Sequence, residues 1–170
     1  MYYFIVNEQG GSGKAKKTWA KVQKLLKKES VEFKAIYTKV DFGASQAAGQ
    51  ISSLPGQKRI VVVGGDGTIN EVINGFTCFD SLSLGVIPTG SGNDFARGIG
   101  LRKNAAKCLK RILASDGSKR IDLGRVHFDD GRSRLFGISS GLGMDAIVCK
   151  KALVSKLKDA LNKIGLGKFV

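Results

Sequence analysis

Three apolar segments of the chain each run directly into a glycine-rich loop, and this arrangement restricts the fold more than any other feature. The clearest is RIVVVGGDGT at residues 59–68. The other two are the run Tyr2–Val6, before a loop at 10–13, and the run Leu84–Ile87, before a loop at 90–92. Continuous apolar runs of this kind are typical of strands buried on both faces of a parallel sheet.

Segments with helical periodicity alternate with these runs. After the first loop, Trp19, Val22 and Leu26 recur at helical spacing. A strand at Phe33–Thr38 comes next, and further helices are predicted at 44–53, at 69–76, opening near Asn93, and at 104–114. Strands that alternate with helices indicate an α/β domain built on a parallel sheet. We assign residues 1–119 to this first domain.

The pattern changes after residue 119. Two strands of an antiparallel hairpin are predicted at 119–128 and 133–139, with Asp130-Gly131 in the turn. We therefore expect a β-rich second domain to begin within 120–170, and we expect the chain to be truncated inside it. A basic amphipathic helix is predicted at Lys150–Lys163, with an apolar stripe of Leu153, Leu157, Ala160, Leu161 and Ile164.

The glycine loops predict phosphate binding. In a parallel sheet they fall at the carboxyl edge, where ligands bind, and glycine lets the backbone approach an anion at a helix N-terminus. A Walker A loop is excluded because Glu8 and Ala15 replace its first glycine and its Ser/Thr. A dinucleotide pattern at 141–146 comes late in the chain, without a following strand–helix–strand unit, and is a weak match.

Two carboxylates accompany these loops. A carboxylate beside phosphate-binding amides repels the ligand unless a cation lies between them, so Asp66 is a candidate Mg²⁺ ligand or a base for an incoming hydroxyl. The alternative is that Asp66 caps the next helix, as aspartate often does. Asp94 opens a helix directly after the last of these loops and is a candidate to position water or a metal ion, with helix capping again as the alternative. The residues alone leave both alternatives open.

The net charge of +14 indicates a polyanionic partner. Nucleic acid is disfavoured, because no aromatic-studded sheet or basic recognition helix is evident. No apolar stretch reaches the roughly 18 residues of a membrane span, so any membrane contact is expected to be peripheral. The three cysteines lack disulfide or zinc spacing, which favours a cytoplasmic location. His127 has no partner carboxylate in any motif and is expected to be structural.

The segments GGDGTINEVINGF (64–76) and GVIPTGSGNDFARGIG (85–100) resemble the diacylglycerol kinase catalytic domain, specifically the soluble bacterial lipid kinases related to sphingosine and ceramide kinases. The resemblance extends to Asn7 with Gly10-Gly11 and to SSGLGMDA at 139–146. It implies an α/β nucleotide-binding domain followed by a β-rich domain. It also implies an ATP- and Mg²⁺-dependent lipid kinase that phosphorylates a diacylglycerol-like lipid in the cleft between these domains.

The resemblance also assigns roles to individual residues. It makes Asp66 and Asp94 catalytic, with Asp66 the candidate metal ligand. It assigns nucleotide binding to Asn7, Gly11, Gly64, Gly65, Gly67, Thr68, Glu71, Thr89, Gly90, Gly92 and Asn93. Glu8 departs from the family, which usually has proline there. In the bacterial enzymes the proposed base and a structural Mg²⁺ site lie beyond the position of residue 170, so we expect this chain to bind nucleotide but to phosphorylate poorly.

Two other interpretations remain open: a non-catalytic nucleotide-binding remnant, and an enzyme like the nicotinamide dinucleotide kinases, which also carry a Gly-Asp-Gly phosphate loop. PTGSGNDFAR at 88–97 favours the lipid kinase over the dinucleotide kinase. The expected partners are ATP and a lipid substrate at a membrane surface, with no nucleic acid. A homodimer is left open.

Overall fold

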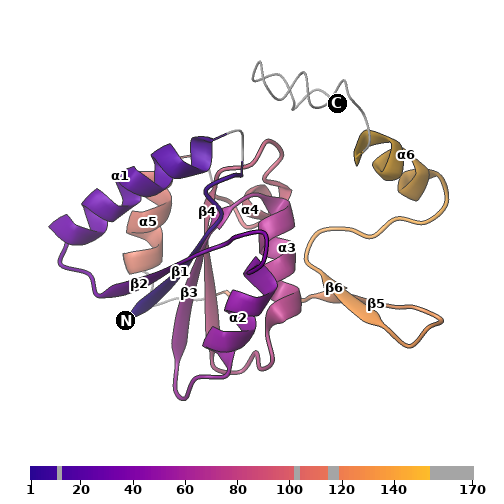
Figure 1. The fold of residues 1–170 in the computed structure, drawn as a ribbon, viewed down its shortest axis with the longest axis horizontal. Coiled ribbons are helices and arrows are strands. Elements are labelled where there is room, and N and C mark those ends of the chain that lie inside the picture. Colours follow the sequence, from indigo (N-terminus) through magenta and orange to yellow (C-terminus); the bar gives the residue numbers. More distant parts are fainter. Residues whose placement is uncertain (11–12, 102–103, 115–118, 154–170) are drawn as a thin grey trace.

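The structure is a computed structural model that describes residues 1–10, 13–101, 104–114 and 119–153. Its main body is a parallel sheet in the order β2-β1-β3-β4, flanked by helices, and a separate two-stranded sheet follows (Figure 1). The prediction of an α/β fold with a parallel sheet is confirmed. The elements are β1 (Tyr2–Val6), α1 (Lys14–Lys28), β2 (Phe33–Tyr37), α2 (Ala44–Ser52), β3 (Lys58–Gly64), α3 (Asp66–Gly75), β4 (Leu82–Pro88), α4 (Asp94–Gly98), α5 (Ala105–Ala114), β5 (Gly124–His127), β6 (Ser133–Phe136) and α6 (Met144–Leu153).

The helices cover both faces of the parallel sheet, which explains the continuous apolar run of β3. Ile60 and Val62 pack into the core formed with α2 and α3. Val61 and Val63 pack into the core formed with α1 and α5. Successive residues of a strand point to opposite faces, so a strand covered on both sides is apolar at every position.

The order of the strands places a crevice between β1 and β3. The chain runs outward from β1 to β2 on one side and from β3 to β4 on the other, so the connections that leave β1 and β3 diverge. Ligands bind at such a switch point in open parallel sheets. Val6 pairs with Val63, and the N–H of Asn7 donates to the carbonyl of Val63 at 3.0 Å. The first two glycine loops therefore begin next to each other at the carboxyl edge of the sheet.

The predicted hairpin is confirmed as the antiparallel pair β5–β6. Its turn closes through the N–H of Gly131, which donates to the carbonyl of Phe128 at 3.0 Å. Gly131 has φ of 82°, in the left-handed region that favours glycine. His127 is exposed on β5. Along the part of the chain that the structure describes, no helix combines the length and the apolar character needed to cross a membrane.

Two helices begin earlier than the sequence predicted. Helix α3 starts at Asp66 and not at Ile69, because Gly64 and an extended Gly65 make the bend between them. Asp66 therefore occupies the first helical position, where a carboxylate complements the helix dipole. Helix α6 starts at Met144, six residues before the predicted Lys150. Of the predicted apolar stripe only Leu153 falls within α6, and Leu157, Ala160, Leu161 and Ile164 lie outside the described residues.

Candidate active site

The second and third glycine loops touch through their backbones. A Cβ added to Gly65 would lie 3.1 Å from the Cα of Gly90, and one added to Gly90 would lie 2.8 Å from the Cα of Gly65. The N–H of Thr89 donates to the carbonyl of Gly64 at 3.0 Å, extending the pairing of β3 with β4 into the loops. Both positions need glycine because any side chain would push the loops apart.

Asn93 holds the third loop closed. Its Oδ1 accepts from the N–H of Gly90 at 2.8 Å, and its Nδ2 donates to the carbonyl of Gly90 at 2.6 Å. The residue is buried and has φ of 57°, a left-handed conformation that asparagine tolerates better than most residues. Asn93 therefore shapes the loop that leads into α4.

Asn7 connects the first loop to the second across the switch point. Its Nδ2 donates to Oγ1 of Thr68 at 3.0 Å, and its Oδ1 accepts from the N–H of Gly10 at 3.2 Å. Gly64 leaves the space that Thr68 fills, since a Cβ on Gly64 would lie 2.7 Å from the Cβ of Thr68. The structure thus brings Asn7, Gly64 and Thr68 together, whereas Gly11 lies outside the described residues.

Asp66 links the second loop to the helix that follows the third. Its Oδ1 accepts from the backbone N–H of Phe95 at 3.1 Å, in the first turn of α4. Its own helix begins after Gly65 without a side-chain cap. The alternative that Asp66 caps its own helix is therefore wrong, because its carboxylate caps a helix 29 residues further along the chain.

Asp66 and Asp94 both approach Gly92 with their carboxylates. Oδ2 of each carboxylate is 3.3 Å from the position that a Cβ on Gly92 would take. Asp94 is exposed and pairs with Arg97. No group of three or more His, Cys, Asp or Glu side chains able to hold a metal occurs among the described residues. Two neighbouring carboxylates still fit Mg²⁺, which proteins commonly bind through one or two carboxylates together with substrate phosphates and water.

A cavity of about 290 Å³ opens beside Asp66. Its walls come from α3, α4 and the segment at 136–139, which begins at the last residue of β6. Its lining mixes apolar and polar residues, which are Asp66, Gly67, Ile69, Asn70, Ile73, Phe95, Phe136, Gly137, Ile138 and Ser139. Sequence reasoning missed Asn70, Phe95 and the 136–139 segment, because the hairpin is far from α3 in the sequence.

Of the remaining predicted residues, Thr89 is buried, whereas Gly67 and Glu71 are exposed. Thr89 is 6% exposed, and its Oγ1 has no hydrogen-bond partner among the described residues. A buried hydroxyl without a partner loses its hydration, so this position suits a ligand oxygen. Gly67 is exposed in the first turn of α3, with no atom within 4 Å of its Cβ position. Glu71 is exposed on the next turn of α3 and does not line the cavity.

Comparison with known proteins gives consistent results. Residues 1–126 match the family described as "Diacylglycerol kinase catalytic domain". The chain is 34% identical over 165 residues to "Putative lipid kinase YtlR" of Bacillus subtilis, covering 92% of this chain and 52% of that protein. It is 35% identical over 97 residues to a diacylglycerol kinase of Mycobacterium tuberculosis, covering 57% of this chain and 31% of that protein.

Solved structures agree with the sequence comparisons. A crystal structure described as "a putative diacylglycerol kinase from Bacillus anthracis str. Sterne" superposes with a TM-score of 0.60 at 28% identity. The match covers 72% of this chain and 44% of that one. The chain thus spans about half, or less, of the length of the relatives that it matches.

Proposed function

The chain belongs to the diacylglycerol kinase catalytic domain family, and we propose that it binds Mg-ATP for transfer of the γ-phosphoryl group to the hydroxyl of a diacylglycerol-like lipid. One observation carries the proposal: two glycine loops in backbone contact bring Asp66 and Asp94 to Gly92, and Asp66 also lines a cavity that contains large apolar side chains.

The geometry of the loops supports the nucleotide part of the proposal. The first turn of α3 leaves backbone N–H groups without helical partners, and Gly67 leaves the approach to them open. The unpartnered hydroxyl of Thr89 offers a further donor on the neighbouring loop. We propose that the phosphates of ATP lie against these two loops.

The two carboxylates support the Mg²⁺ part. Asp66 and Asp94 would hold the ion, which neutralises phosphate charge and polarises the transferring group when it is bound. Oδ1 of Asp66 is occupied by the N–H of Phe95, and its Oδ2 faces Gly92 beside Oδ2 of Asp94. One carboxylate oxygen of Asp66 therefore fixes the position of the side chain, and the second oxygen is left to bind the metal ion or to accept a proton.

The cavity supports the acceptor part. Its volume is close to the lower end of the range for ligand pockets, and its lining combines the carboxylate of Asp66 with five large apolar side chains. We propose that the glycerol end of the lipid enters here with its hydroxyl toward Asp66. The enzyme would then contribute mainly positioning and charge stabilisation, and Asp66 would take up the hydroxyl proton or hold the metal ion.

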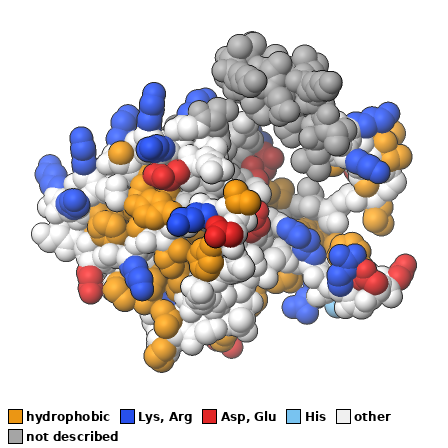
Figure 2. Space-filling model, in the orientation of Figure 1, with side chains coloured by type: hydrophobic (Ala, Val, Ile, Leu, Met, Phe, Trp, Pro, Cys, Tyr) orange, Lys and Arg blue, Asp and Glu red, His pale blue; other side chains and the backbone are white. Residues whose placement is uncertain are grey.

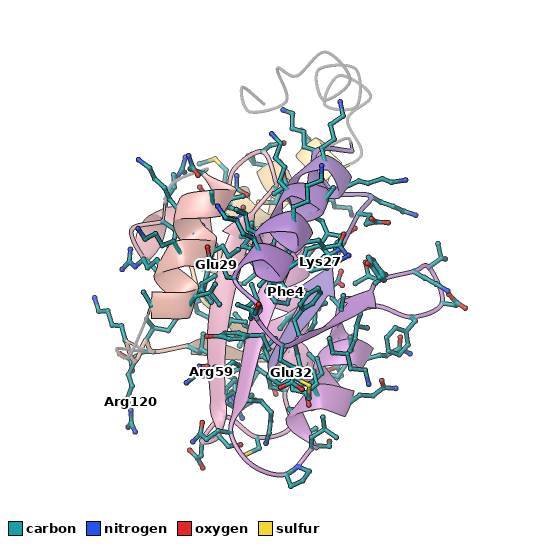
Figure 3. The ribbon with its side chains drawn as sticks, turned by 90° about the vertical axis from the view of Figure 1, so that its left-hand side faces the viewer. Phe4, Lys27, Glu29, Glu32, Arg59 and Arg120 are labelled. Carbon is teal, nitrogen blue, oxygen red and sulfur yellow. The ribbon has the colours of Figure 1, made fainter. Side chains whose placement is uncertain are left out.

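The distribution of charge supports binding to an anionic membrane surface. Seven exposed lysines lie on α1, and Lys107, Lys110 and Arg111 are exposed on α5. By contrast, α2 carries no charged residue, and α3 carries only Asp66 and Glu71. Blue side chains follow α1 at the upper left of Figure 2, and Figure 3 views the α1–α5 layer directly. We propose that this basic layer attracts the protein to an anionic membrane, where each basic residue near the surface contributes about 1 kcal/mol. The cavity lies on the α3 side of the sheet, so this layer does not itself present the acceptor site.

Incubation of the intact protein with Mg²⁺, radiolabelled ATP and mixed-lipid vesicles that contain diacylglycerol tests the proposal. We expect label in the lipid extract with the intact gene product, and weak labelling with the 170-residue chain alone. Label that appears only in a soluble dinucleotide would support the dinucleotide kinase alternative. Tight ATP binding without transfer to any lipid would support the non-catalytic nucleotide-binding module.

A further inference from the structure

Two asparagines on α3 bind the backbone of β6. Nδ2 of Asn74 donates to the carbonyl of Leu135 at 2.9 Å, and the N–H of Leu135 donates to Oδ1 of Asn74 at 2.8 Å. Nδ2 of Asn70, one turn earlier on α3, donates to the same carbonyl at 3.1 Å. We call these contacts the amide clamp. They join residues that are 61 to 65 positions apart in the sequence.

Leu135 is suited to this contact by its place in the hairpin. It pairs with Arg125 of β5, which is the one strand beside β6 in the described part of the chain. In an antiparallel pair, every second residue directs its N–H and carbonyl away from the partner strand. Asn74 satisfies both groups of Leu135, as the backbone of a further strand would.

Arg134 fixes the orientation of Asn70. Its Nε and Nη2 both donate to Oδ1 of Asn70, at 3.1 and 2.6 Å. A guanidinium can only donate, so the oxygen of Asn70 must face Arg134 and its nitrogen must face Leu135. Nδ2 of Asn74 also donates to the backbone carbonyl of Asn70 at 2.8 Å. Each carboxamide therefore has a single orientation.

The clamp holds Leu135, the residue that comes immediately before one wall of the cavity in the sequence. Leu135 is followed by Phe136, Gly137, Ile138 and Ser139, all of which line the cavity beside Asp66. The same wall also packs on α4, since a Cβ on Gly137 would lie 2.8 Å from Cε2 of Phe95. The same α3 thus carries Asp66 at its first residue and the clamp near its end.

We propose that Asn74, supported by Asn70, is a positioning residue that sets the distance between the 136–139 wall and Asp66 and so determines how the acceptor binds. This role rests on the proposed acceptor site in the cavity. The hydrogen bonds of the clamp join α3 to β6 and involve none of the residues of the nucleotide loops. Loss of the clamp should therefore weaken acceptor binding and leave ATP binding unchanged.

The test compares Asn74→Asp with Asn104→Asp in the full chain. In Asn74→Asp the group that donated to two carbonyls becomes an acceptor, and the clamp opens. Asn104 is an exposed cap whose Oδ1 accepts from the N–H of Lys107 at 3.0 Å, and an aspartate keeps that bond. Arg134→Ala is a second variant, because an exposed side chain on the hairpin can be removed without unfolding the α/β body.

Two measurements follow for each variant: amide hydrogen exchange at 133–139, and binding of monomeric dioctanoylglycerol and of ATP by calorimetry. For Asn74→Asp we expect exchange at 133–139 to be at least about tenfold faster with β3 unchanged, and dioctanoylglycerol binding to be about tenfold weaker with ATP affinity within about twofold. Arg134→Ala should shift the same quantities less, and Asn104→Asp should shift neither.

Unchanged exchange at 133–139 in Asn74→Asp would overturn the clamp. Faster exchange with unchanged dioctanoylglycerol affinity would overturn the positioning role and make the contact purely structural. Both outcomes can be distinguished from an error in the proposed function. If the proposed function is wrong, the unaltered chain binds no dioctanoylglycerol at all.

Discussion

At the scale of single residues, Asp66 combines a structural bond with a proposed chemical role, and two substitutions separate them. Asp66→Asn keeps an oxygen for the N–H of Phe95, whereas Asp66→Ala removes it. We expect the alanine variant to lose about 1–2 kcal/mol more stability in urea unfolding than the asparagine variant. Both should lose Mg²⁺-dependent phosphoryl transfer. Full transfer by Asp66→Asn would show that the charge is not needed.

Gly67 offers a second test at this scale, because none of the described residues fills the space beside it. A Cβ at Gly67 or at Gly98 would meet no atom within 4 Å, so alanine should be tolerated structurally at both positions. We expect Gly67→Ala to reduce ATP affinity by about tenfold through contact with the ligand, at unchanged thermal stability. Gly98→Ala is the control and should bind ATP normally. Equal affinities would place the phosphates elsewhere.

At the scale of elements, α2 and α3 approach so closely that one glycine is required between them. A Cβ on Gly75 would lie 2.1 Å from the carbonyl oxygen of Ser45, which is backbone and cannot rotate away. We expect Gly75→Ala to lower the free energy of unfolding by more than about 2 kcal/mol. Gly98→Ala should change it by less than about 1 kcal/mol in the same urea titration. A small effect at Gly75 would mean that the two helices separate easily.

At the scale of the whole molecule, the cluster of exposed basic residues on α1 and α5 predicts that this layer contributes more to membrane binding than basic residues elsewhere. Lys17→Glu/Lys21→Glu/Lys24→Glu should weaken binding to anionic vesicles by at least about tenfold, and binding by the unaltered chain should fall as salt rises. Lys119→Glu/Arg120→Glu/Arg125→Glu changes the net charge equally at exposed positions elsewhere, and should weaken binding less. Cosedimentation with vesicles measures both, and equal losses would mean that only net charge matters.

The sequence by itself determined the parallel α/β body, the positions of the glycine loops and the turn of the hairpin. These features follow from local rules: β3 is apolar from Ile60 to Val63 because both of its faces are covered there, and Gly131 supplies the left-handed turn. The sequence also indicated Asp66 and Asp94 as site residues beside the loops. The predicted start of α3 was three residues late, because the prediction placed the bend at Asp66.

Only the tertiary structure decided which of these residues meet. The contact of Gly65 with Gly90, the bond from Phe95 to Asp66, the cavity wall at 136–139 and the amide clamp all join segments far apart in the chain. Such pairs depend on the order of the strands in the sheet and on where the hairpin packs. The hydrophobic periodicity of a single segment contains no information on either. The residue types of the site can therefore be read locally, but their partners are set by the packing of the whole molecule.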